Sequence, residues 1–208
     1  MTAAGLRERK KQRTRCALID SAFALFRRKG FDATTIDEIA EAVDVSPRTF
    51  FRYFTSKEEV ALSLVDEQLG VLMGLLAERP ADEPVLTALH RAAVDVVRAC
   101  ESGANGFDAE HYESMQELLA TSPALAAHSM EVGSARVAEL SRLIGVRMGV
   151  DHLTDPRPHL VASIGICAVQ TAVNSWRGTD GHAKSSELVD RAFQLITEGI
   201  NYPSVLTP

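Results

Sequence analysis

Two arginines and an aromatic ring share the outward face of a short helix predicted to begin at residue 47. Ser46 can cap this helix, and Pro47 fits its first position, where a missing N–H costs little. At helical spacing the outward side chains are Arg48, Phe51, Arg52 and Thr55. A guanidinium binds guanine O6 and N7 through two hydrogen bonds and also pairs with phosphates. This face therefore predicts DNA binding; for either arginine alone, a solvated charged face is the alternative.

The other residues able to do chemistry are scattered along the chain. Its six histidines form no HExxH pattern or other close metal pair. Its three cysteines, Cys16, Cys100 and Cys167, form neither a CxxC site nor a disulfide framework. We therefore expect no metal, no cofactor and no enzymatic activity, and free thiols that fit a reducing cytoplasm. A small helical enzyme with an incidental DNA-binding motif is the alternative.

The elements that must position these residues all read as helices. Period-2 alternation typical of strands is absent, so we expect an all-α fold of about nine helices. After a first helix over 6–29, Gly30 fits the position that ends a helix, and Phe31 can fold back onto its apolar stripe. The later helices are expected over about 35–43, from 47, and over 56–79, 84–101, 109–121, 123–148, 156–177 and 186–202.

The second and third helices are joined closely enough for a helix-turn-helix. Thr35 and Glu38 form a capping box that opens the second helix. Ala40 is small enough for two helices to cross closely there. Asp44 stands where the turn requires a left-handed conformation, which Asp tolerates better than most residues. These positions in register predict a helix-turn-helix rather than an incidental helical pair.

Charge is distributed unevenly along the chain. The net charge is -6, yet residues 1–60 hold 12 basic and 9 acidic side chains, and residues 1–29 hold nine and two. Because residues 1–60 are net basic and the rest of the chain is net acidic, we expect the N-terminal end to contact a polyanion. Residues 158–176 carry no charged side chain but include several polar ones, so we expect a helix buried in a bundle rather than a membrane span.

Residues 34–60, TTIDEIAEAVDVSPRTFFRYFTSKEEV, closely resemble the DNA-binding signature of the TetR-type transcriptional regulators. The resemblance implies a homodimer with a helix-turn-helix DNA-binding domain over 1–56 and a ligand-binding and dimerisation domain over 57–208. It further implies a repressor released from a double-stranded, palindromic operator by a small, largely apolar effector. A DNA-organising protein that responds to no ligand is the alternative.

Carried over position by position, the resemblance assigns roles within the helix-turn-helix. It makes Arg48 and Arg52 base readers. It places Thr35, Thr49, Tyr53 and Lys57 at phosphates or in the groove. Ser46, the cap of the third helix, is included among the DNA-binding residues. Phe51 stands where the family usually has Tyr, and Asp44 where it usually has Gly. The basic run 7–13 is either an arm that reaches the DNA or a solvated tail.

The second predicted domain, residues 57–208, offers candidates for an effector site and for a dimer interface. Cavity candidates are His111, Met115, Met130, Gln170 and Asn174. For each residue taken alone, packing or a satisfied polar group in the core is the favoured alternative. Two stripes of small or apolar residues predict an intermolecular four-helix bundle formed by the last two helices: Val161, Gly165, Ala168 and Ala172, then Leu188, Ala192, Leu195 and Ile196. The alternative is that both stripes face the core of their own subunit.

Overall fold

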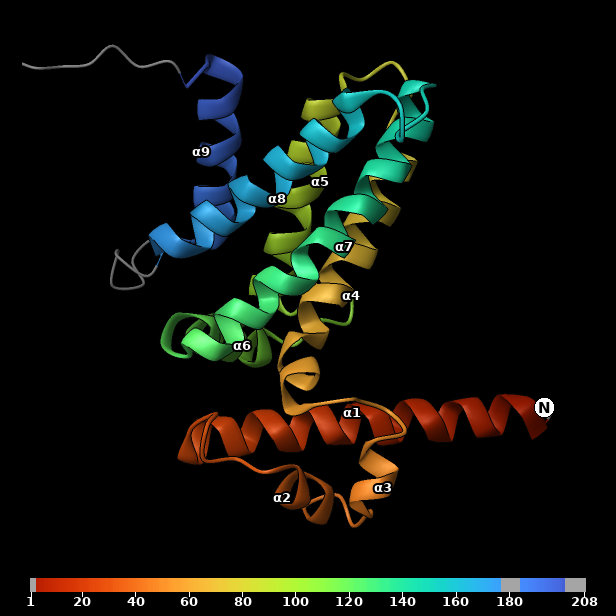
Figure 1. Cartoon of the computed structure of the whole chain (residues 1–208), viewed down its shortest axis with the longest axis vertical. Coiled ribbons are helices and arrows are strands. Elements are labelled where there is room, and N and C mark those ends of the chain that lie inside the picture. Colours follow the sequence, from red (N-terminus) through yellow and green to blue (C-terminus); the bar gives the residue numbers. More distant parts are fainter. Residues whose placement is uncertain (1–2, 177–183, 201–208) are drawn as a thin grey trace, which may run out of the picture. The chain divides into compact units, whose positions relative to one another are not determined.

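The computed structural model describes residues 3–176 and 184–200, and every regular element in these ranges is an α-helix (Figure 1). The prediction of an all-α fold is confirmed. The helices are α1 (Ala3–Lys29), α2 (Ile36–Glu41), α3 (Pro47–Phe50), α4 (Lys57–Glu78), α5 (Val85–Ser102), α6 (Ala109–Thr121), α7 (Pro123–Met148), α8 (Pro156–Trp176) and α9 (Ser185–Glu198). The predicted bounds agree to within a few residues because capping and helix-ending residues stand close to them.

The chain divides into two compact units. The first comprises Met1–Glu67 and Asp108–Glu131, and the second comprises Gln68–Phe107 and Val132–Pro208. The first unit thus includes α6 and the start of α4, which the predicted division after residue 56 assigns to the second domain. The units describe compactness, so the functional division at 56 and 57 stays a prediction.

The first unit is built on an apolar stripe along α1. Leu18, Ala22 and Phe23 are fully buried there. Gly30 ends α1 with a φ of +88°, and its N–H donates to the Phe26 carbonyl at 2.9 Å. The buried Phe31 ring then packs on the Phe26 ring, with 5.0 Å between centroids, as the sequence predicts.

Helix α6 packs against α1 within the same unit. The His111 ring stacks on the Phe23 ring with centroids 4.8 Å apart. One turn further along α1, the Arg27 guanidinium donates to the Ser114 hydroxyl at 3.3 Å. These contacts join segments about ninety residues apart in sequence, which explains why periodicity gives no sign of them.

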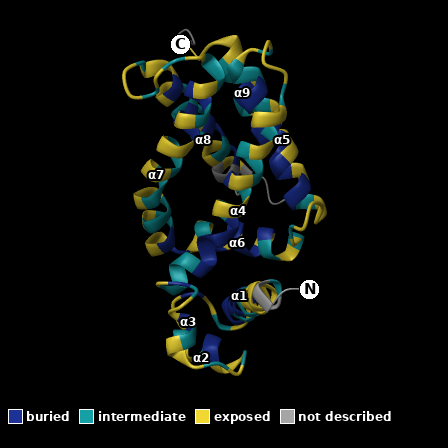
Figure 2. Ribbon diagram, turned by 90° about the vertical axis from the view of Figure 1, so that its right-hand side faces the viewer, coloured by how far each residue is buried: buried dark blue, intermediate teal, exposed yellow. Residues whose placement is uncertain are grey.

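The second unit has α9 packed against both α5 and α8. The Phe193 ring is fully buried and stacks on His90 of α5, whose Nε2 lies 2.8 Å from Asp190 Oδ1. At the start of α9, the Ser186 N–H and hydroxyl donate to the Glu101 carboxylate at 2.9 and 2.7 Å. Figure 2 shows the buried face that α5 contributes to this core.

The small residues of α8 pack within their own chain. A Cβ added at Gly165 would lie 2.5 Å from Leu89 Cδ2, and Ala168 and Ala172 are buried. Gly165 thus packs against α5 of its own chain, and the place of Gly165, Ala168 and Ala172 in a dimer interface stays a prediction. Val161, Leu188, Ala192, Leu195 and Ile196 are only partly buried, and their place in an interface stays a prediction.

Arg147 of α7 holds the connection between α4 and α5. Its guanidinium donates to four carbonyls, those of Leu76, Arg79, Pro80 and Glu83. The distance is 3.1 Å to the Arg79 oxygen and 3.2 Å to the Glu83 oxygen. The last carbonyls of a helix lack partners within the helix and carry partial negative charge. Arg147 therefore satisfies the end of α4 and the turn that follows it.

Among the described helices, α4 is the one long and apolar enough to cross a membrane, judged by length and composition. Core helices pass the same test. Val60, Ala61 and Leu62, near the start of α4, are buried within the first unit.

Candidate DNA-binding surface

The helix-turn-helix is held in place by two caps and one left-handed residue. The Thr35 hydroxyl accepts from the Glu38 N–H, and the Glu38 carboxylate accepts from the Thr35 N–H at 2.9 Å, which completes the predicted capping box. The Ser46 hydroxyl accepts from the Thr49 N–H at 3.2 Å. Between α2 and α3, Asp44 has a φ of +55°, as predicted for the turn. These local bonds fix where α3 begins.

Helix α3 rests on a layer of aromatic rings. Phe50 and Phe54 are buried, with 5.8 Å between their ring centroids. The Arg15 guanidinium of α1 lies over the Phe54 ring at 5.3 Å and pairs with Glu67 at 2.9 Å. Ala40 is fully buried, and its carbonyl accepts from the Val45 N–H at 3.0 Å, as the close crossing requires. The opposite face of α3 is consequently turned to solvent.

The outward face carries the side chains that the sequence singles out. Arg48 is exposed, and among the described residues its side chain makes no hydrogen bond or ion pair. Phe51 is 56% exposed. Arg52 is also exposed; its Nη2 donates to the Tyr53 hydroxyl at 3.3 Å, and its guanidinium lies 5.2 Å from the centre of that ring. The structure thus brings two guanidiniums and one apolar ring together on one surface.

Several predicted phosphate contacts already have partners within the chain. The hydroxyls of Ser46 and Thr49 lie 3.0 Å apart, and the Thr35 hydroxyl donates to Glu38 at 2.8 Å. A hydroxyl has further lone pairs, so these bonds do not prevent a phosphate contact. Their roles at DNA stay predictions.

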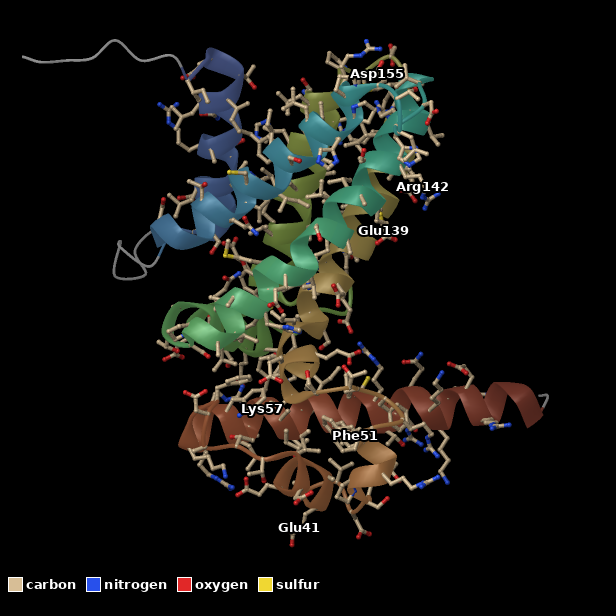
Figure 3. The ribbon with its side chains drawn as sticks, in the orientation of Figure 1. Glu41, Phe51, Lys57, Glu139, Arg142 and Asp155 are labelled. Carbon is tan, nitrogen blue, oxygen red and sulfur yellow. The ribbon has the colours of Figure 1, made fainter. Side chains whose placement is uncertain are left out.

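Lys57 reaches back to the turn before α2. Its ammonium donates to the carbonyls of Phe31, Asp32 and Thr34 at 2.8, 3.3 and 3.2 Å, and lies 4.5 Å from the centre of the Phe31 ring (Figure 3). An ammonium has three donors, and all three are used here. The sequence offers no sign of this bracing role, and the predicted phosphate contact stays a prediction.

A second brace, also invisible in the sequence, joins α1 to α2. The Lys29 ammonium pairs with the Glu38 carboxylate that completes the capping box. The hydrogen bond from Lys29, followed by those from Thr35, lowers the pKa of Glu38 to about 2. The carboxylate that caps α2 is therefore charged near neutral pH.

The basic segment at the start of the chain is helical rather than an extended arm. Side chains at 7, 9, 10, 11 and 13 are exposed on α1. The pKa of Tyr53 is lowered, first by the hydrogen bond from Arg52, then by the Thr14 hydroxyl and the charges of Arg52 and Lys11. This part of α1 thus lies beside the end of the helix-turn-helix.

The effector candidates are distributed over both units. His111 and Met115 lie one turn apart on α6, with Met115 buried, whereas Met130 and Gln170 are exposed. The side chain of Asn174 lies outside the described residues. That any of these residues line a cavity stays a prediction.

The described geometry defines a class of protein: a helix-turn-helix DNA-binding protein with an additional helical unit. The family model for "Bacterial regulatory proteins, tetR family" matches residues 18–64, and the model for the "MftR C-terminal domain" matches residues 83–201. The HTH-type transcriptional regulator TcmR of Streptomyces glaucescens is 37% identical over 173 residues, which cover 83% of this chain and 76% of TcmR. MftR of Mycobacterium tuberculosis is 27% identical over 93% of this chain and 94% of its own.

The chain belongs to the TetR family of transcriptional regulators. Solved structures agree in fold. A TetR-family regulator from Syntrophomonas wolfei has a TM-score of 0.62 at 19% identity, covering 94% of this chain and 99% of its own. FadR from Bacillus subtilis, in complex with stearoyl-CoA, has a TM-score of 0.57 at 19% identity, covering 88% and 98%.

Proposed function

We propose that this regulator is a homodimeric repressor that binds an inverted-repeat operator and is released from it by a small, largely apolar effector. The observation that carries the proposal is the exposed surface of Arg48, Phe51 and Arg52, supported from beneath by buried rings. We place the protein in the cytoplasm, with no membrane partner and no cofactor. The test is selection of binding sites from a random duplex library, which should yield inverted repeats with half-sites about 34–36 Å apart or a multiple of that.

We expect Arg48→Ala and Arg52→Ala each to weaken operator binding by about 1–3 kcal/mol, roughly 5- to 150-fold, and to relax specificity at one base pair. Each substitution removes a bidentate contact to a base edge. Titrations at one fixed salt concentration, on the operator and on each single base-pair variant, measure the loss. Arg142→Ala, which removes an exposed arginine of α7, is the matched control. Equal losses on operator and random DNA would contradict base reading.

The dimer in this proposal uses the faces of α8 and α9 that remain accessible. The accessible face of α8 is formed by residues at spacings of three and four, namely Leu160, Ile164, Cys167 and Thr171. On α9 they are the partly buried Leu188, Ala192, Leu195 and Ile196. Two such helices from each subunit can form a four-helix bundle around a two-fold axis. The two DNA-binding domains, linked through the dimer, would then contact both half-sites of the operator.

The apolar effector is supported by the use of this fold elsewhere. FadR proteins from Bacillus subtilis and Thermus thermophilus were solved in complex with stearoyl-CoA and lauroyl-CoA. The candidate ligand contacts in this proposal are His111, Met115 and Met130 in the first unit and, separately, Gln170 and Asn174 on α8 in the second.

We expect at least one compound of an apolar panel, beginning with stearoyl-CoA and lauroyl-CoA, to raise the melting temperature and to weaken operator binding. Coupling of about 1–3 kcal/mol is typical, and it must be reciprocal, so operator DNA should weaken binding of the compound by the same factor. Thermal shift and fluorescence anisotropy measure both directions. A compound that binds without changing operator affinity would argue against the sensor, while the DNA-binding part would stand.

A further inference from the structure

We propose that Phe51 recognises the methyl group of a thymine in each operator half-site. The proposal rests on the DNA-binding function above and names the base feature that this side chain reads. Among the described side chains of residues 7–67, Phe51 is the exposed large hydrophobic one, at 56%. An apolar ring of this size on a DNA-binding surface is placed to contact an apolar group.

The Phe51 ring is held outward rather than left to collapse. It packs edge-on against the Phe50 ring, with centroids 5.6 Å apart and planes at 87°. Phe50 and Phe54 already fill the space beneath α3, so Phe51 has no buried position to occupy. Its backbone N–H donates to the carbonyl of Pro47 at 3.0 Å, which keeps the residue in the last turn of the helix. The backbone at Phe51 is therefore held at the end of α3, and its ring is presented outward.

The neighbours of Phe51 place it at base edges. Arg48 precedes it by three residues and Arg52 follows it directly, and both are exposed. In a helix-turn-helix these positions enter the major groove. Phenylalanine has no hydrogen-bond donor or acceptor on its side chain. The C5-methyl of thymine is the apolar group that the major-groove edges present, so it is the feature that Phe51 can distinguish.

The experiment uses the full-length protein and an operator obtained by selection. Each thymine of the half-site is replaced in turn, symmetrically in both half-sites, by deoxyuridine, which removes only the methyl group. At one pair of positions we expect the wild-type protein to lose about fourfold in affinity per half-site, roughly fifteenfold in all, as the burial of one methyl group gives. In Phe51→Ala the same replacement should have no effect, whereas Phe51→Leu should retain part of the sensitivity.

The outcomes separate this inference from the function on which it rests. Failure to select any operator would overturn the proposed repressor. Specific binding in which no uracil replacement affects the wild type would overturn the role of Phe51. A Phe51→Ala protein that loses affinity equally for thymine and uracil duplexes would also overturn it, because the ring would then contact only the backbone. Phe51 is exposed, and circular dichroism of the variants verifies that they fold.

Discussion

Leu195→Lys is expected to dissociate the dimer and to lower operator affinity by about 100-fold or more. Leu195 is partly buried on the accessible face of α9, between Leu188 and Ile196 in the predicted interface. An ammonium without a partner is costly to bury in an apolar interface, so the subunits would separate. A single DNA-binding domain would then bind one half-site, without the gain in affinity that comes from linking two domains.

Analytical ultracentrifugation and operator titration measure the two effects of Leu195→Lys. The matched control is Gln194→Lys, which adds the same charge one residue away on the exposed side of α9, where Gln194 contacts Asp190. We expect the control to remain dimeric. A wild-type protein that sediments as a monomer at micromolar concentration and binds a single half-site with full affinity would rule out this architecture.

Arg147→Met is expected to lower the free energy of unfolding by about 2–4 kcal/mol, because hydrogen bonds from a charged donor to partly buried carbonyls are lost without replacement. The four acceptors lie at the end of α4 and in the turn before α5. Arg147→Lys should recover only part of the loss, since an ammonium cannot reproduce the planar fork of the guanidinium.

Urea unfolding followed by circular dichroism measures the effect of these Arg147 variants. Arg142→Met is the control: this arginine is exposed on the same helix, five residues earlier (Figure 3). It should change stability by no more than about 0.5 kcal/mol. Equal losses for the two arginines would mean that the carbonyl contacts contribute nothing specific.

Local signals made much of the fold predictable from sequence. Thr35, Ser46 and Gly30 each satisfy or relieve backbone groups near a helix end, so the end of α1 and the starts of α2 and α3 followed from residue type. The left-handed turn at Asp44 and the buried crossing at Ala40 were predicted for the same reason: each is required by its immediate neighbours.

The contacts that could not be predicted join distant parts of the chain. A stripe of small residues on α8 indicates that a helix approaches closely, but not which one, and Gly165 in fact meets Leu89 of the same chain. Lys57 follows a family signature, yet the three carbonyls that it binds come from a turn over twenty residues away. The grouping of α6 with α1 depends on the pairing of His111 with Phe23, which no local pattern contains.

The charges within the helix-turn-helix are separated by helix. Asp37 and Glu41 of α2 (Glu41 is labelled in Figure 3) and the turn residue Asp44 are exposed. Arg48 of α3 and Arg52, just beyond its end, are exposed as well. During a diffusional encounter, a phosphate backbone repels the carboxylates and attracts the guanidiniums over distances near the Debye length. Collisions that lead with α2 are therefore short-lived, and those that lead with α3 persist long enough to dock. This segregation orients the protein before any base is contacted, so salt should slow its association with DNA more than it speeds its dissociation.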